Sequence, residues 1–205
     1  MDLFQPSSSF TRIALHDADV RLLPAFLSPT EAAQLQQQLI AQTPWRCDEI
    51  FVWGKRHLQP RLVAWYSDEG CRYTYSGIQM QPLPWTPLLA DLKARVEQAC
   101  EAHFNSVLLN YYRNERDSMG MHSDDEPELG PQPCIASLSL GEERVLSFAS
   151  RGIGPRRTLR LPLPSGSLLL MQGDTQHHWK HGIAKSTRHM AARVNLTFRR
   201  ILPPA

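Results

Sequence analysis

The sequence has little net charge, no closely spaced cysteine pair and no long apolar run. Its 205 residues carry 22 Lys and Arg against 20 Asp and Glu, so contact with an acidic polymer would need a local basic patch. Its 4 cysteines form no C-x-x-C pair, which argues against a zinc knuckle or a disulfide framework. No apolar stretch reaches membrane length, and "MDLFQPSSSF" lacks the apolar centre of a signal peptide. We therefore expect a soluble protein of a reducing compartment.

Several signatures of common enzyme classes are also missing. The chain has no G-x-S-x-G nucleophile motif and no Cys-His signature of a cysteine protease. Glu142 and Glu143 are adjacent, so on a strand they would point to opposite faces and could not act as a glycosidase pair. The length fits one domain with a core of its own.

Two stretches predict helices with similar starts. In "SPTEAAQLQQQLIAQ", Ser28 fits the N-cap, Pro29 the first helical position and Glu31 a capping box. In "TPLLADLKARVEQACEAHF", Thr86 and Pro87 repeat the device, and apolar residues recur at helical spacing. Both helices should pack one apolar face against a core.

After residue 105 the apolar pattern changes to a period of two, in short runs separated by turn residues. Strands at this spacing are typical of a sandwich or a jelly-roll barrel. Residues 45 to 85 are rich in aromatic residues, Arg and Pro and are expected to form hairpins and loops. We predict a mainly β core flanked by two helices, with an aromatic and basic segment laid across it.

The last strand, "ARVNLTFRR", has one apolar and one polar face. Alternation places Val194, Leu196 and Phe198 on one side, and Arg193, Asn195, Thr197 and Arg199 on the other. In "LLNYYR", Asn110 and Tyr112 likewise share a face. The polar faces could together bind a small dianion through charge-assisted hydrogen bonds, or the last strand's polar side could simply be solvated.

The stretch "GMHSDDEPELG" offers a candidate metal site. His122 and Asp124 lie two residues apart and would project together from a strand or tight turn. A distant His would complete a two-His, one-carboxylate set, the geometry of non-haem Fe(II) oxygenases. In "TQHHWKHGI", His177, His178 and His181 all compete for that place. The alternative is a surface His beside acidic residues.

The chain resembles the AlkB family of Fe(II)/2-oxoglutarate dioxygenases, which repair alkylated nucleobases. The resemblance extends from residue 45 onward and is densest over 105–201, in "NYY", "MHSDDE", "IASLSLG", "LPLPSGSLLLM", "HHWKHGI" and "RVNLTFRR". It implies a double-stranded β-helix, or jelly-roll, core with an N-terminal nucleotide-recognition lid. It also implies Fe(II), 2-oxoglutarate as cosubstrate and O2.

The resemblance assigns roles to particular residues. It makes His122, Asp124 and His181 the iron ligands and leaves His178 on a non-ligand position. It gives the binding of 2-oxoglutarate to Asn110, Tyr112, Arg193, Asn195, Thr197 and Arg199. Within that set, Arg193 would pair with the distal carboxylate and Arg199 with the carboxylate near iron.

The resemblance also implies a pocket for a flipped base. Tyr73 and Tyr75 would line it, although ordinary cross-strand packing explains them equally. Asp125 and Glu126 would face the cationic base or its exocyclic amine, with a loop-surface carboxylate as the alternative for Glu126. A flipped base loses stacking in the duplex and regains part of it on aromatic side chains.

Contacts with the rest of the nucleic acid are expected from two segments. Trp53, beside Gly54, would fill the gap left by the flipped base or else lie in the core. Lys55, Arg56 and Arg61 would track phosphates. Arg151, Arg156 and Arg157, with Arg160, lie on a Gly-Pro loop with no nearby acid and would contact the opposite strand, unless the hairpin is merely solvated.

We therefore predict a monomeric oxidative demethylase of alkylated DNA, restoring 1-methyladenine and 3-methylcytosine and releasing succinate, CO2 and formaldehyde. The alternatives are the same chemistry on RNA or single strands, a relative acting on a protein or small molecule, and a damage-binding module without turnover. We expect a flexible segment and first strand over 1–20, helices and lid over 21–104, and the core over 105–205, all in one compact domain. The location would be cytoplasmic or nucleoid-associated, or nuclear in a eukaryote, with no membrane partner.

Overall fold

The computed structural model describes residues 9–47, 49–52, 55–71, 73–75, 78–80, 82–152, 155 and 157–203. For residues 50–52, 55–57, 73–75 and 78–80, only the backbone is described. Within these residues, no helix is both long enough and apolar enough to cross a membrane.

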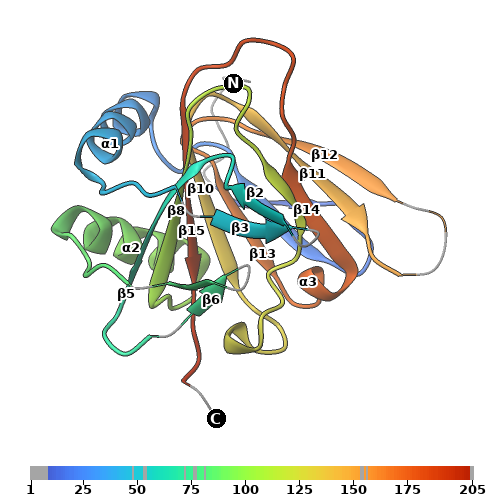
Figure 1. Cartoon of the computed structure of the whole chain (residues 1–205). Helices are drawn as coiled ribbons and strands as arrows, with labels where there is room; N and C mark the ends of the chain where they lie inside the picture. Colours follow the sequence, from blue (N-terminus) through green and yellow to red (C-terminus); the bar gives the residue numbers. More distant parts are fainter. Residues whose placement is uncertain are drawn as a thin grey trace, which may run out of the picture.

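Two antiparallel sheets form the core, as the period-two pattern predicted (Figure 1). The larger sheet has seven strands in the order β1 (Thr11–Ile13), β2 (Asp19–Leu23), β13 (Leu168–Gln172), β10 (Ile135–Gly141), β15 (Arg193–Arg199), β8 (Ser106–Tyr112) and β5 (Leu62–Ser67). The smaller sheet has four strands in the order β12 (Thr158–Leu163), β11 (Arg144–Ser150), β14 (Trp179–Ile183) and β9 (Met119–His122). The expected jelly-roll core is confirmed. Its larger sheet also takes β1, β2 and β5 from before residue 105.

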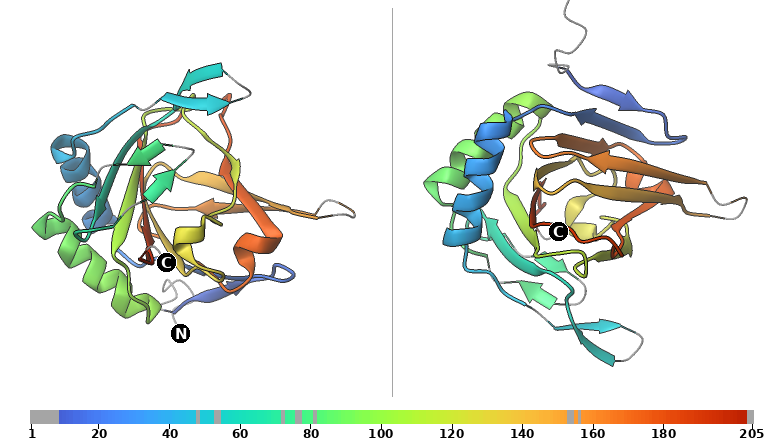
Figure 2. Two further views of the ribbon diagram at one scale, coloured as in Figure 1. Left: turned by 60° about the horizontal axis from the view of Figure 1, so that its bottom comes forward. Right: turned by 90° about the horizontal axis from the view of Figure 1, so that it is seen from above.

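The two long helices, α1 (Pro29–Gln42) and α2 (Pro87–Cys100), lie side by side against the larger sheet (Figure 2). Ser28 and Glu31 form the predicted capping box of α1, and the Thr86 hydroxyl accepts a hydrogen bond from the Leu89 backbone N–H at the start of α2. Two short helical turns, η1 (Pro127–Leu129) and α3 (Thr175–His178), complete the helical elements among the described residues.

The apolar interior has two main layers. One layer packs Leu35, Leu92 and other helix residues against the outward face of the larger sheet, including Val194, Leu196 and Phe198. The other layer fills the space between the two sheets and includes Tyr112 and Phe148. The polar face of β15 therefore points between the sheets. The alternative of a solvated polar face on this strand is wrong.

Two hairpins, one on each side of β5 in the sequence, project from the same side of the molecule (Figures 1 and 2). They are β3 (Glu49–Val52) with β4 (Lys55–Leu58), and β6 (Tyr73–Tyr75) with β7 (Ile78–Met80). These hairpins form the segment expected to act as a nucleotide-recognition lid, and that role stays a prediction. Trp53, the expected wedge, lies outside the described residues.

Candidate active site

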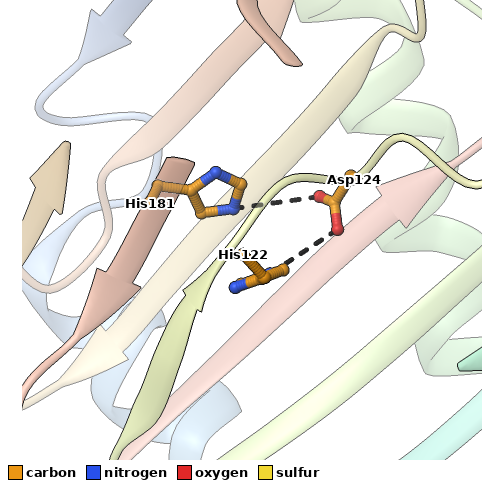
Figure 3. A group of neighbouring side chains, drawn as sticks. All are labelled: His122, Asp124 and His181. Atoms are coloured by element: carbon orange, nitrogen blue, oxygen red, sulfur yellow. Dashed lines mark ion pairs between the residues drawn. The ribbon is translucent and has the colours of Figure 1, made fainter. Parts of the chain in front are cut away.

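Three side chains from two strands and a loop meet between the sheets (Figure 3). His122 ends β9 and pairs in register with His181 on β14, while Asp124 follows two residues later. Asp124 lies 3.6 Å from His122 Nε2 through Oδ1 and 3.9 Å from His181 Nε2 through Oδ2. One ligand atom from each residue lies within 4.8 Å of the others, which suits a single metal ion.

His177 and His178, the other candidates for the third ligand, lie elsewhere. Both belong to α3, both are exposed, and neither joins the cluster. His177 instead contacts the backbone oxygen of Pro131. His181 instead lies on β14, where the side chains alternate between two faces. His181 therefore points inward, while Lys180 beside it is exposed.

A close approach of two backbones holds the two histidines opposite each other. A Cβ atom on Gly182 would lie 2.9 Å from the carbonyl oxygens of both Gly120 and Met119, and 3.0 Å from Met121 Sδ. The pairing of β9 with β14 shifts register at this point. Only glycine allows the two strands to approach this closely beside His181.

We expect Gly182→Ala to weaken metal binding roughly 10- to 100-fold, the range found when support around a metal ligand is lost. The methyl group would push β14 away from β9 and separate His181 from His122. The control is Gly120→Ala, because a Cβ atom there would meet nothing within 4 Å. Equal metal affinities of the two variants, measured by titration of Mn(II), would refute this explanation.

The surroundings keep both histidines neutral and suitable as ligands. Burial lowers the pKa of His122, and burial together with the neighbouring His122 lowers the pKa of His181 to about 3. His122 Nδ1 lies 3.0 Å from the Gly120 carbonyl oxygen. When the Nδ1–H donates to this oxygen, Nε2 carries no proton and its lone pair points toward Asp124.

Asp124 is ionised despite complete burial. Burial would raise its pKa, but Arg199 and the two histidines outweigh it and lower the pKa to about 2. Arg199 donates a hydrogen bond of 2.9 Å from Nη2 to Oδ1, while Oδ2 has no hydrogen-bond partner among the described residues. Gln176, which the sequence did not single out, accepts from the Asp124 backbone N–H at 3.0 Å.

A pocket adjoins the three residues, and the predicted polar faces of β8 and β15 form part of its wall. Its lining includes the triad together with Asn110, Tyr112, Arg193, Asn195, Thr197 and Arg199. The two strands pair directly, with Asn110 opposite Asn195 and Tyr112 opposite Arg193. The sequence-based grouping of these residues is therefore observed, while their assignment to a particular ligand stays a prediction.

Arg193 is the most deeply buried cation of this pocket. Its Nη2 donates to Ser139 Oγ at 3.0 Å, whereas Nε and Nη1 are buried without a hydrogen-bond partner among the described residues. Asn195 donates to Ser137 Oγ at 2.8 Å. Sequence reasoning missed Ser137 and Ser139, although their spacing in "IASLSLG" places both on the polar face of β10.

Arg61 has a different place from the one expected. Its side chain is 4 % exposed and therefore cannot track phosphates on the surface, so that prediction is wrong. Its Nε donates a 2.6 Å hydrogen bond to Asn110 Oδ1, and its Nη1 lies 3.4 Å from the Ser118 carbonyl oxygen. Arg61, the residue directly before β5, therefore contacts Asn110 in the wall of the pocket.

Arg151 and Asp125 contact each other. Nη1 of Arg151 donates to Asp125 Oδ2 at 2.5 Å, to Ser123 Oγ at 3.1 Å and to the Gln176 carbonyl oxygen at 2.9 Å. The expectation of a basic loop without a nearby acid is therefore wrong for Arg151. In this conformation Asp125 is paired with a cation of the protein rather than left free to face a base.

The other expected nucleic-acid contacts are only partly described. Arg157 and Arg160 are exposed on the β11–β12 hairpin, and Glu126, two residues after Asp124, is half-buried. Arg156 lies outside the described residues. The side chains of Lys55, Arg56, Tyr73 and Tyr75 also lie outside them, so their roles stay predictions.

Known proteins share this sequence and this fold. A model of the 2OG-Fe(II) oxygenase superfamily matches residues 19–199. Mouse alpha-ketoglutarate-dependent dioxygenase alkB homolog 3 is 42% identical over 192 residues, which are 90% of this chain and 66% of that protein. Mouse DNA oxidative demethylase ALKBH2 is 46% identical over 161 residues, 76% of this chain and 67% of that protein.

The chain spans slightly less than two thirds of the length of alkB homolog 3. The solved structure of OsALKBH1 is 16% identical, with a TM-score of 0.63, and covers 93% of this chain and 100% of its own. At 16% identity, this similarity supports the fold alone. The sequence relatives and the family model carry the classification: the chain belongs to the 2OG-Fe(II) oxygenase superfamily and, within it, to the AlkB family.

Proposed function

We propose that this protein is an oxidative demethylase of N-alkylated nucleobases in DNA. The observation that carries the proposal is the single pocket that combines the His122–Asp124–His181 cluster with the polar faces of β8 and β15. The relatives named as a DNA oxidative demethylase and as alpha-ketoglutarate-dependent dioxygenases support the substrate class and the cosubstrate.

The described residues fit an Fe(II) ion and a dicarboxylate. Nε2 of His122, Nε2 of His181 and the Asp124 carboxylate would hold the ion, since two neutral imidazoles and one carboxylate are its usual facial set. Nε and Nη1 of Arg193 would donate to the distal carboxylate of 2-oxoglutarate. With O2, the bound ion and keto acid supply the oxidant that hydroxylates an N-methyl group, so that formaldehyde leaves the base and 2-oxoglutarate becomes succinate and CO2.

The protein's own groups set up this reaction. Arg199 fixes the Asp124 carboxylate and lies in the same pocket, so it would also approach the carboxylate near the ion. The apolar side chains of Leu146, Met171 and Ile183 line the pocket and limit access of water. Arg61 orients the Asn110 amide, because its Nε–H holds Oδ1 and leaves the amide N–H groups for a ligand.

The substrate base would enter from the side of the two hairpins. Tyr73 and Tyr75 belong to β6 of one hairpin, and a base stacked on an aromatic ring gains about 1–3 kcal/mol. Glu126, two residues after Asp124, would contact the base. Trp53 as a wedge and Lys55, Arg56, Arg151, Arg156 and Arg157 as phosphate contacts remain part of the proposal, with Arg151 first having to leave Asp125.

Product analysis on defined oligonucleotides tests the proposal. We expect the protein, supplied with Fe(II), 2-oxoglutarate and O2, to remove the methyl groups of 1-methyladenine and 3-methylcytosine with one formaldehyde and one succinate per repaired base. Single-stranded DNA, duplex DNA and RNA of the same sequence separate the DNA reading from the RNA reading. Succinate release that ignores every methylated oligonucleotide would contradict the proposal and favour a protein or small-molecule substrate.

A further inference from the structure

A further buried arginine, Arg144, lies next to the cosubstrate pocket and has no ion-pair partner among the described residues. Arg144, at the start of β11, is 2 % exposed. Its guanidinium group donates to three backbone carbonyl oxygens, those of Asn114 at 3.3 Å, Asp117 at 3.0 Å and Ala184 at 2.6 Å. In the described part of the chain no carboxylate lies within ion-pair distance of it. Its direct partners are backbone dipoles, and the carboxylates of Asp117, Glu142 and Glu115 act on its charge only from farther away.

The nearest acidic side chain is already engaged elsewhere. Both carboxylate oxygens of Asp117 accept hydrogen bonds from Arg113, at 2.8 Å and 2.9 Å. Arg113 is 44% exposed on the outer side of this turn, whereas Arg144 meets only the Asp117 backbone. One turn therefore separates a surface ion pair from a buried cation that has no ion-pair partner among the described residues.

Tyr112 joins the two buried arginines of this region. The guanidinium carbon of Arg144 lies 5.7 Å from the centre of the Tyr112 ring, and that of Arg193 lies 5.1 Å from it. Tyr112 itself is fully buried. Two guanidinium groups on one phenol ring fix its orientation through cation–π contacts, which strengthen when the groups are desolvated.

The two cations also disfavour each other in the free protein. Burial lowers the pKa of both Arg144 and Arg193. Tyr112 acts in the opposite direction on both, as do nearby carboxylates on Arg144, while the charge of Arg144 lowers the pKa of Arg193 further. A buried cation left without a counter-charge costs free energy that a bound anion would return. Arg193 lines the pocket and Arg144 lies behind it across the Tyr112 ring, so a carboxylate bound at Arg193 would also reduce the repulsion between the two arginines.

We propose that Arg144 is a positioning residue for the cosubstrate: it fixes Tyr112 against Arg193 and adds positive potential at the end of the pocket that takes the distal carboxylate. This inference rests on the proposed use of 2-oxoglutarate. Among the described residues no contact links Arg144 to the metal-binding side chains, so we expect its effect to fall on the keto acid. The residue acts through Tyr112 and Arg193 rather than by direct contact.

Keto-acid binding to the Mn(II)-loaded protein tests the proposal without turnover. Calorimetric titration would use 2-oxoglutarate and 2-oxobutyrate, which has the same keto-acid end but lacks the distal carboxylate. For Arg144→Gln we expect 2-oxoglutarate to bind about 10-fold more weakly, the effect of one charge roughly 10 Å away at an effective dielectric constant of about 20. The affinities for Mn(II) and for 2-oxobutyrate should stay as in the unmodified protein.

Arg113→Gln is the matched control, since it removes the ion pair of Arg113 with Asp117 in the same turn but neither of the two cation–π contacts with the Tyr112 ring. It should leave 2-oxoglutarate binding unchanged, and an equal loss in both variants would overturn the proposal. Unchanged 2-oxoglutarate binding in Arg144→Gln would overturn it too, as would an equal loss for both keto acids.

If Arg144→Gln does not fold, Arg144→Lys decides by the same criterion, because Lys cannot donate to three carbonyl groups and cover the ring together. Failure of the unmodified protein to bind 2-oxoglutarate would instead refute the proposed function.

Discussion

Replacing His181 by Ala is expected to abolish demethylation, with a loss of roughly 1000-fold or more in turnover. The side chain is buried, its Nε2 lies 3.9 Å from Asp124 Oδ2, and among the described residues no histidine besides His122 and His181 reaches the cluster. Removing the imidazole leaves two ligands, which hold Fe(II) too weakly for catalysis. Formaldehyde release and the dissociation constant for Mn(II) measure the two consequences.

The matched control is His178→Ala, three residues earlier in the chain. His178 is exposed and stands outside the cluster, so its loss should leave metal affinity unchanged. Circular dichroism on heating would show whether both variants remain folded. A folded His181→Ala protein that binds metal as tightly as His178→Ala would disprove the assignment of the third ligand.

Arg193→Ala should raise the 2-oxoglutarate concentration needed for half-maximal turnover by roughly 30- to 1000-fold. Truncating one partner of a buried charge pair costs about 2–4 kcal/mol, and 1.4 kcal/mol corresponds to a factor of ten. The requirement for the methylated oligonucleotide should change far less, since Arg193 lines the pocket and is buried between the sheets. Steady-state titration of each substrate gives both values.

Arg188→Ala provides the comparison, because Arg188 is an exposed arginine on the loop that leads into the same strand. Both substrate requirements should be unaffected in that variant. If Arg193→Ala raised the requirements for keto acid and oligonucleotide equally, its role in cosubstrate binding would be wrong. A general loss of folding would appear in the unfolding temperature rather than in one substrate alone.

Local periodicity was enough to predict the framework of the site. The alternation of β15 and β8 placed Arg193, Asn195, Asn110 and Tyr112 on the faces where they are found. The capping residues of α1 were also evident, because capping depends on neighbours within four positions. The metal cluster itself needed the family resemblance, since spacing alone left three histidines open.

Contacts between residues far apart in sequence could not be predicted in the same way. Arg61 precedes a strand in an Arg-rich segment, and only the pairing of β5 with β8 turns it toward Asn110. Arg151 meets Asp125 across 26 positions, which no local pattern encodes. Arg144 has no motif around it, and its position beside Tyr112 follows from the packing of one sheet on the other.

The most direct test is spectroscopic and uses neither nucleic acid nor oxygen. Anaerobic addition of Fe(II) and 2-oxoglutarate to the unmodified protein should produce the visible charge-transfer band of a keto acid chelated to iron, at one ion per chain. The same additions to Asp124→Ala, which removes the only carboxylate of the cluster, should produce no band. Absence of the band in the unmodified protein, or a full band in Asp124→Ala, would contradict the account of the site.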